Sequence, residues 1–456
     1  MSFLKRNISL APLVLVGVVL LSADRLSLQG VSSSPESVHR EIVSRVDREY
    51  DSLLQLYRHL HANPELSFHE QKTAERIQKE LEKTGFEVTA NFGGAGIVGV
   101  LRNGIGPTLM IRTDLDGLPV TEQTGLEYAS RVKTQDDKGN EVGVMHACGH
   151  DVHMTCFVGT ARLLSQLKDR WQGTLVMIGQ PAEERGEGAK RMLKEGLFQK
   201  FPKPDYILAL HDDALSKTGK VGVVEGNALA GVDSVDLTVR GISGHGAYPY
   251  ATRDPIVLSA QIILALQTIV SREMRAIDPA VVTVGSIHGG TKHNIIPDEV
   301  RLQLTIRHYS DSVRTNILSS IERMAKGLAQ VAGVPRGLEP TMRVSESISP
   351  TFNDPEFTRR TARAIESILG KDNVERKEPV MGSEDFGLFG RTPEKIPICI
   401  FWLGAVSRER LLESQREEGK ALPSLHSSSF APVPEPTIKT GIKAMTAAAL
   451  EVLGRK

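Results

Sequence analysis

The sequence predicts an α/β protein, in which a mostly parallel-sheet domain with helices on both faces is interrupted by an inserted α+β two-layer sandwich. The chain has 456 residues, more than one ordinary core accommodates, so two domains are expected. Strand-like apolar runs alternate with helical patterns up to about residue 230, which indicates a parallel sheet. Beyond that point the order becomes strand, helix, strand, strand, helix, strand, which is typical of a compact sandwich.

The N-terminus resembles an export leader. Lys5 and Arg6 precede a short apolar run at 10–21, and a small-residue pair follows it. This pattern predicts a signal peptide or an uncleaved anchor at 1–23, so the protein is expected to be exported (periplasmic or secreted) or membrane-anchored. Residues 24–37 are polar and predict a linker.

The first part of the main domain, 38–230, is expected to begin with a helix near 38–61. Ser67 and Glu70 then have the spacing of a capping box for a helix that ends at Gly85. The remaining expected elements are strands at 86–92, 97–102, 107–116, 174–181 and 206–213, with a helix at about 152–168.

The inserted lid or dimerisation domain is expected over 231–346, after which the main domain resumes at 347–456. Inside the insertion, alternating runs predict strands at 233–241, 280–289, 299–308 and 340–346, and apolar periodicity predicts helices at 254–272 and 311–331. The resumed domain contains a helix, a strand at 396–404 and a final helix that ends near Leu453.

The composition describes a folded protein with no sign of a polyanionic partner. Hydrophobic residues make up 40% and charged residues 24% of the chain, and the formal net charge is zero. Neither nucleic acid nor an anionic membrane surface is therefore an expected partner. The three cysteines have no regular spacing and predict no disulfide framework; Cys156 and Cys399 are expected to be small buried hydrophobes.

Five residues of metal-binding type follow or flank the predicted strands: Cys148, His150, Glu184, His211 and His426. Asp114 and Asp116 end one strand, and Glu183 stands beside Glu184 as a second carboxylate. Because ligands of open α/β sheets bind beyond the carboxyl ends of the strands, these side chains are expected to converge there. A metal site with a spare carboxylate predicts hydrolysis of an amide by activated water.

Each motif also has a structural interpretation. A Glu pair is commonly a solvated surface, a His after an apolar strand is commonly a core residue, and Asp114 and Asp116 could cap a turn. The main alternative for the whole set is a structural zinc site, which is closed, tetrahedral and often rich in cysteine. Five candidate ligands exceed one tetrahedron and favour two adjacent metals that share a water.

Two motifs of other enzyme classes are excluded. Gly94, Gly96 and Gly99 spell G-x-G-x-x-G, but they run into a predicted strand, whereas a dinucleotide fingerprint opens a helix. The zincin motif H-E-x-x-H is absent from the sequence.

Eight ordered segments resemble those of the amidohydrolases related to hippurate hydrolase and to plant auxin-conjugate (IAA-amino acid) hydrolases. These enzymes belong to the dinuclear metallopeptidase group that includes aminoacylase and carboxypeptidase G. The resemblance covers about residues 45–450. The segments are HANPELSFHE, RTDLDGLPV, MHACGHDVH, GQPAEE, SGHGAYP, NIIPDE, MGSEDF and SLHSSSF.

The resemblance implies roles for most of these residues. The metal ligands would be Cys148, His150, Glu184, His211 and His426, and they would hold two divalent ions, zinc or manganese. Glu183 would be the general base, and Asp116 would orient a ligand. His245 would steady the oxyanion, in some relatives from a partner subunit, with a turn histidine as the alternative. Asn294 and Arg307 would contact the substrate, with a surface charge as the alternative for Arg307.

The expected substrate is a small N-acyl amino acid, and a homodimer through the inserted domain is an expected assembly. A dipeptidase or carboxypeptidase on the same scaffold, or a non-catalytic metal-containing binding protein, are the alternatives. One segment departs from the family pattern, because relatives usually have a proline shortly after the equivalent of His211, whereas this chain continues with Asp212 and Asp213. These carboxylates are expected to add negative charge beside a ligand.

Overall fold

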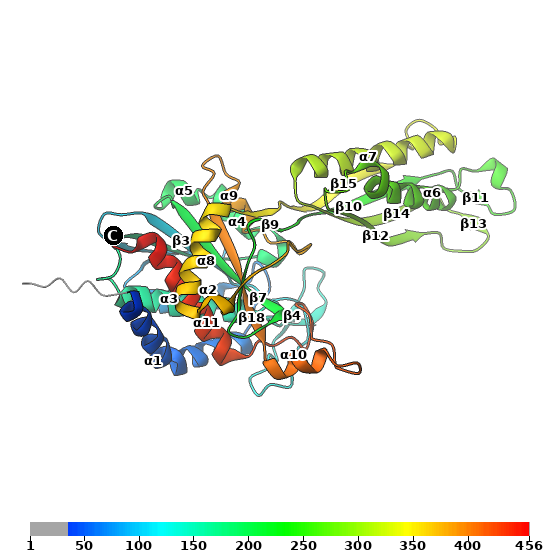
Figure 1. Ribbon diagram of the computed structural model, residues 1–456. Helices are drawn as coiled ribbons and strands as arrows, with labels where there is room; N and C mark the ends of the chain where they lie inside the picture. Colours follow the sequence, from blue (N-terminus) through cyan, green and yellow to red (C-terminus); the bar gives the residue numbers. More distant parts are fainter. Residues whose placement is uncertain (1–34, 456) are drawn as a thin grey trace, which may run out of the picture.

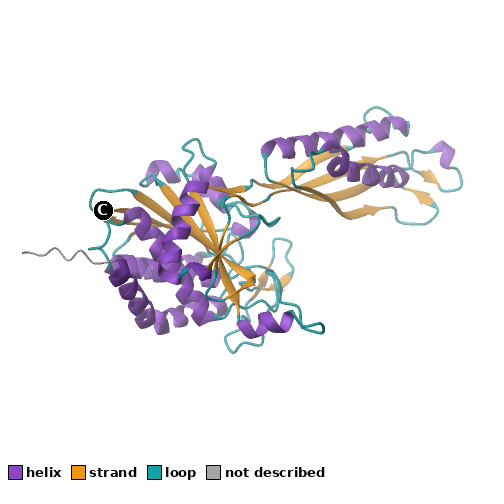
Figure 2. Cartoon of the chain, in the orientation of Figure 1, coloured by secondary structure: helices purple, strands orange, loops and turns teal. Residues whose placement is uncertain are grey.

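The computed structural model describes residues 35–455 (Figure 1). The predicted leader, 1–23, lies outside the described residues, as does the linker up to residue 34. Helix α1 (Pro35–Ala62) begins within the last three residues of the predicted linker. A smaller, elongated body projects from a larger α/β body, and extended segments join the two (Figures 1 and 2).

The main body is built on an eight-stranded mixed sheet in the order β1-β2-β6-β3-β7-β18-β8-β17. Its centre, β6-β3-β7-β18, is parallel, whereas β1, β2 and the β18–β8 pairing are antiparallel. The predicted mostly parallel sheet is thereby confirmed. The strands are β1 (Glu87–Ala90), β2 (Ile97–Asn103), β3 (Thr108–Asp114), β6 (Gly173–Gln180), β7 (Tyr206–Lys217), β8 (Val221–Val223), β17 (Val374–Arg376) and β18 (Ile398–Val406).

Helices cover both faces of this sheet, which explains why its central strands are nearly continuous apolar runs. In β3, Leu109 and Ile111 point into one core, and Met110 between them points into the other. One face is covered by α1, α2 (Gln71–Glu82), α3 (His150–Gln166), α8 (Pro355–Leu369) and α11 (Pro434–Leu453). The other is covered by α4 (Gly188–Lys194), α5 (Leu197–Lys200) and α9 (Gly387–Gly390).

Short elements complete the main body. They are β4 (Lys133–Gln135), β5 (Glu141–Gly143), β9 (Gly226–Leu229), β16 (Thr351–Asn353) and α10 (Arg408–Ser414). Cys156 and Cys399 are fully buried free thiols, as expected for small core residues.

The inserted body is a four-stranded antiparallel sheet in the order β12-β14-β10-β15, packed on α6 and α7. In β14, buried and more exposed residues alternate, as expected when only one face of a sheet is covered. The elements are β10 (Gly231–Arg240), β11 (Gly244–His245), α6 (Pro255–Thr268), β12 (Ala280–Gly289), β13 (Ile295–Ile296), β14 (Glu299–His308), α7 (Asp311–Val331) and β15 (Thr341–Ile348).

Two local predictions are wrong. The Ser67–Glu70 capping box does not form, because neither side chain caps α2: Ser67 Oγ donates to Asp116 Oδ2, and Glu70 Oε1 accepts from the backbone of Ala182. Strand β7 does not end at residue 213, as predicted, but continues to Lys217, which pairs with Val406 of β18. His211 still projects past β3, whose pairing with β7 ends at Arg112–Ala209.

Candidate metal centre

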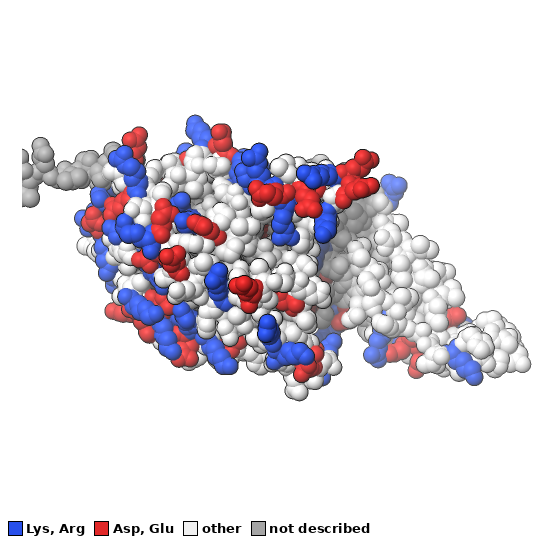
Figure 3. Space-filling model, turned by 90° about the horizontal axis from the view of Figure 1, so that it is seen from below, with Lys and Arg blue, Asp and Glu red and all other residues white. Residues whose placement is uncertain are grey.

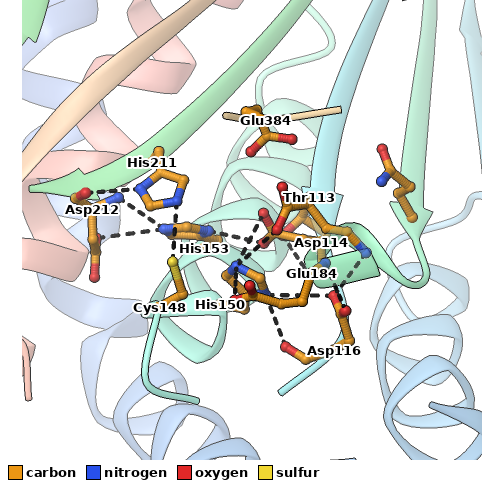
Figure 4. A network of polar contacts seen from close by, with 12 residues as sticks. Thr113, Asp114, Asp116, Cys148, His150, His153, Glu184, His211, Asp212 and Glu384 are labelled. Carbon is orange, nitrogen blue, oxygen red and sulfur yellow. Dashed lines mark hydrogen bonds and ion pairs between the residues drawn. The ribbon is translucent and has the colours of Figure 1, made fainter. Parts of the chain in front are cut away.

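The five predicted ligands meet at one edge of the main sheet, as Figure 4 shows for Cys148, His150, Glu184 and His211. Cys148 and His150 stand at the start of α3, and Glu184 lies in a one-turn helix directly after β6. His211 extends from β7 and His426 from a loop before α11, where it has a left-handed φ of 66°. His426 is 55% exposed, so it lies at the solvent side of the centre.

The ligand atoms form two overlapping groups that share Cys148. One group is Cys148, His150 and His211, and the other is Cys148, Glu184 and His426; the ligand atoms of each group lie within 4.8 Å of one another. Cys148 Sγ is 3.5 Å from His211 Nε2, and Glu184 Oε2 is 3.5 Å from His426 Nε2. Two groups that share the Cys148 sulfur fit two adjacent divalent ions better than one closed tetrahedral site.

The chemistry of these donors fits cations. Within the described residues, His150 Nε2 and Glu184 Oε1 are buried without a hydrogen-bond partner, although they lie 3.8 Å apart. Burial, reinforced by neighbouring carboxylates such as Asp116 and opposed by His150, raises the pKa of Glu184 to about 8. Burial lowers the pKa of His211, so its imidazole is neutral near pH 7. Buried polar groups that lack partners are costly, and bound cations would satisfy them.

Asp116 organises this centre without being one of the five ligands. Its backbone carbonyl accepts a hydrogen bond from His150 Nδ1 at 2.8 Å, which leaves Nε2 free to face the centre. Its carboxylate accepts from the backbone amides of Glu183 at 3.2 Å and Glu184 at 3.0 Å. Asp116 therefore fixes one ligand on α3 and the turn that carries another.

Glu183 is buried beside the ligands. Its Oε2 is 3.9 Å from His150 Nε2, and only 7% of the residue is exposed. Burial and then the neighbouring Glu384 carboxylate raise its pKa well above the usual range. A carboxylate with a raised pKa is suited to take up a proton and to return it.

The structure adds two supporting residues that the sequence did not predict. His153 Nδ1 donates to Asp114 Oδ1 at 2.9 Å, and His153 Nε2 accepts from the backbone amide of Asp212 at 2.9 Å. This buried imidazole connects β3 with β7 directly behind His211. Its position three residues after His150 on one helix was the signal that could have identified it.

Arg112 is the second, and it is fully buried within β3. It contacts Asp114 Oδ2 at 2.8 Å, Glu384 Oε1 at 2.8 Å and Asp385 Oδ1 at 3.3 Å, and its Nε donates to Gln180. A charged residue inside an apolar strand was the available signal, because a buried charge requires partners. The sequence alone could not name those partners.

The two aspartates after His211 add less negative charge than expected. Asp213 pairs with Lys377 and accepts from Ser216 Oγ at 2.8 Å. Asp212 is fully buried, and burial, followed by repulsion from Asp151, raises its pKa well above the usual range. One carboxylate is thus neutralised by a lysine, and the other is disfavoured as an anion.

The three residues expected from the inserted domain lie in two places. His245 and Asn294 are exposed neighbours, with Asn294 O accepting from the backbone amide of Gly246 at 2.9 Å. Figure 1 places their strands, β11 and β13, at the end of the inserted body farthest from the main sheet. Arg307 instead lies near the junction, where its Nη1 donates to Ser383 Oγ at 3.3 Å, one residue before Glu384.

Comparison with known proteins gives consistent findings. Residues 110–425 match the model of peptidase family M20/M25/M40. Thermostable carboxypeptidase 2 of Saccharolobus solfataricus is 35% identical over 86% of this chain and 93% of its own length. The IAA-amino acid hydrolase ILR1-like 2 of Arabidopsis thaliana is 33% identical over 75% of each chain, and the N-acetylcysteine deacetylase of Bacillus subtilis is 34% identical over 78% and 89%.

Two solved structures extend the likeness to the fold. A putative aminohydrolase from methicillin-resistant Staphylococcus aureus superposes with a TM-score of 0.79 at 33% identity, over 91% of this chain and 100% of that one. A Bacillus subtilis protein described as a dinuclear metal binding peptidase of the M20 family superposes with a TM-score of 0.69 at 28% identity, with the same coverage.

Proposed function

The chain belongs to peptidase family M20/M25/M40, whose members include hydrolases of amide bonds, and on this premise we propose that it hydrolyses N-acyl amino acids. The proposal rests on one observation: two overlapping ligand groups share Cys148, and the buried carboxylate of Glu183 lies beside them. The named activities of the Arabidopsis and Bacillus relatives, on an acyl–amino acid amide and an acetylated amino acid, support this substrate class.

Different residues of the chain would bind the metals, transfer the proton and bind the substrate. Cys148, His150, Glu184, His211 and His426 would hold two divalent ions, zinc or manganese. When bound, such ions supply water of lowered pKa and polarise the amide carbonyl. Glu183 accepts the proton of the attacking water and returns it to the nitrogen of the leaving amino acid. The Arg307 guanidinium, at the junction of the two bodies, is suited to bind the substrate carboxylate in a bidentate manner.

A substrate panel tests this assignment. The purified protein, after chelation and readdition of zinc or manganese, is given N-acetyl, N-benzoyl and indoleacyl amino acids and dipeptides with a free amine. We expect metal-dependent release of the amino acid from the acylated compounds, at rates well above those for the dipeptides. Faster cleavage of the dipeptides would replace the proposal with a peptidase function. No turnover by metal-loaded, folded protein would favour a binding role.

We also propose a homodimer in which His245 acts at the partner's centre. His245 is exposed at the distal end of the inserted body, remote from the main sheet of its own chain (Figure 1). The inserted body exposes large apolar side chains, and charged side chains are sparse on the face of it that Figure 3 shows. The exposed apolar side chains of the inserted body include Tyr248, Tyr250, Ile256, Val257 and Leu264. Such a surface is typical of an interface between subunits.

Mixed dimers test the exchange of His245. His245→Ala and Glu183→Gln proteins are each expected to be nearly inactive, because each lacks one group at every centre. After unfolding and joint refolding, half of randomly formed dimers hold one intact centre, so about a quarter of wild-type activity is expected. If His245 served its own chain, or if the protein were a monomer, mixing would restore no activity.

A further inference from the structure

Glu70 supports the turn that carries Glu183 and Glu184. Glu70 is fully buried, and its Oε1 accepts a hydrogen bond from the backbone amide of Ala182 at 2.7 Å, across 112 positions of sequence. Its Oε2 has no hydrogen-bond partner in the described part of the chain. The side chain therefore accepts a hydrogen bond from the turn and forms no capping hydrogen bond with its own helix α2, although Glu70 stands at the N-cap of that helix.

Ala182 is held in a conformation that alanine disfavours. Its φ of 49° and ψ of 43° lie in the left-handed region, which is unfavourable for a non-glycine residue. Such a conformation persists only where the surroundings enforce it. The Glu70 carboxylate holds the Ala182 amide, and the carbonyl of Ala182 accepts from Glu187 and Gly188 at 3.3 Å each.

Three consecutive amides of this turn are bound by two carboxylates. Glu70 accepts from Ala182, and Asp116 accepts from Glu183 and Glu184. The left-handed Ala182 lies between the end of β6 and the one-turn helix that begins with Glu183 and Glu184. Asp116 cannot fix the entry to the turn by itself, because neither of its carboxylate oxygens receives the Ala182 amide.

We propose that Glu70 is a positioning residue that holds the 182–184 turn, and thereby places the proposed base Glu183 and the proposed ligand Glu184 together at the centre. This inference rests on the proposed function. Among the described residues, no hydrogen bond or ion pair joins the Glu70 side chain to any of the five ligands, and its link to the turn is the hydrogen bond from the Ala182 amide.

The test compares two replacements of similar volume. Glu70→Gln keeps a carbonyl acceptor for the Ala182 amide, whereas Glu70→Met fills the space and leaves that amide unpaired. Glu65→Met is the matched control: Glu65 lies on the same segment and accepts from Thr73 N and Oγ1 at 2.8 and 2.9 Å, so it supports α2 but not the turn. Each protein is assayed for kcat, for KM and, by competition with a chromophoric chelator, for metal affinity.

We expect Glu70→Met to lose about 10–100-fold in kcat and in metal affinity, as is typical when a support of a metal ligand is removed. KM should change little, and Glu70→Gln should recover most of both losses. Glu65→Met should lower thermal stability and leave metal affinity unchanged. The proposal is overturned if Glu70→Met keeps wild-type kcat and metal affinity, or if the Glu65 control loses them equally. Because metal affinity needs no substrate, it decides the role of Glu70 even if N-acyl amino acids are not hydrolysed.

Discussion

Replacing Glu183 with Gln is expected to lower kcat by about 10²–10⁴-fold, the usual contribution of a general base. The amide of Gln fills the same volume but does not accept the proton of the attacking water. KM and metal content should remain close to wild type, because the five ligands are unchanged. Steady-state kinetics and a metal analysis on the same preparation measure both quantities.

Glu187→Gln provides the matched control for this substitution. Glu187 lies four residues further along the same segment, with a side chain that is 40% exposed and paired with Lys190. Its replacement should leave kcat unchanged. Wild-type kcat for the metal-loaded Glu183→Gln protein would show that another group serves as the base.

Replacing Arg112 with Met is expected to lower the free energy of unfolding by about 3–5 kcal/mol, the usual cost of removing one partner of a buried ion pair. Asp114, Glu384 and Asp385 would lose their shared cation, and none of the three is exposed to water by more than 1%. Burial already raises the pKa of Asp385 to about 8, against the opposing effect of Arg112. Urea denaturation of both proteins measures the difference.

Arg102→Met is the corresponding surface control. Arg102 belongs to the same sheet, but it pairs with Glu87 while both side chains are largely exposed, so its loss should cost less than about 1 kcal/mol. Adding Glu384→Gln to Arg112→Met should recover part of the lost stability, because one unpaired charge is removed. Equal stability of the Arg112 variant and wild type would contradict a structural role for this cation.

The fold was largely predictable because its signals are local. In β3 every residue from Leu109 to Asp114 is buried, and in β14 burial alternates; the sequence carries both patterns as runs of apolar residues. Such periodicity reports which faces are covered, and so distinguishes the main sheet from the inserted one. The convergence of the candidate ligands also followed from a general property of parallel sheets.

The support of the centre was not predictable because its contacts join distant positions. Arg112 and Glu384 are 272 positions apart, and Glu70 and Ala182 are 112 apart. The spacing of Ser67 and Glu70 suggested a local capping box, but both side chains bind the 182–184 turn or Asp116 instead. The tertiary hydrogen bonds to buried groups formed instead of the local cap. Water can take the place of a missing helix cap, whereas a buried group left without a partner has no water to bind.

Metal titration of the chelated protein tests the central claim, metal-dependent amide hydrolysis at the centre around Cys148, most directly. Bound zinc or manganese per chain and release of amino acid from an N-acyl substrate are followed in the same samples. We predict no hydrolysis without metal, and hydrolysis that rises with occupancy as two ions bind to each chain. Full hydrolysis by protein that holds no metal would contradict the claim.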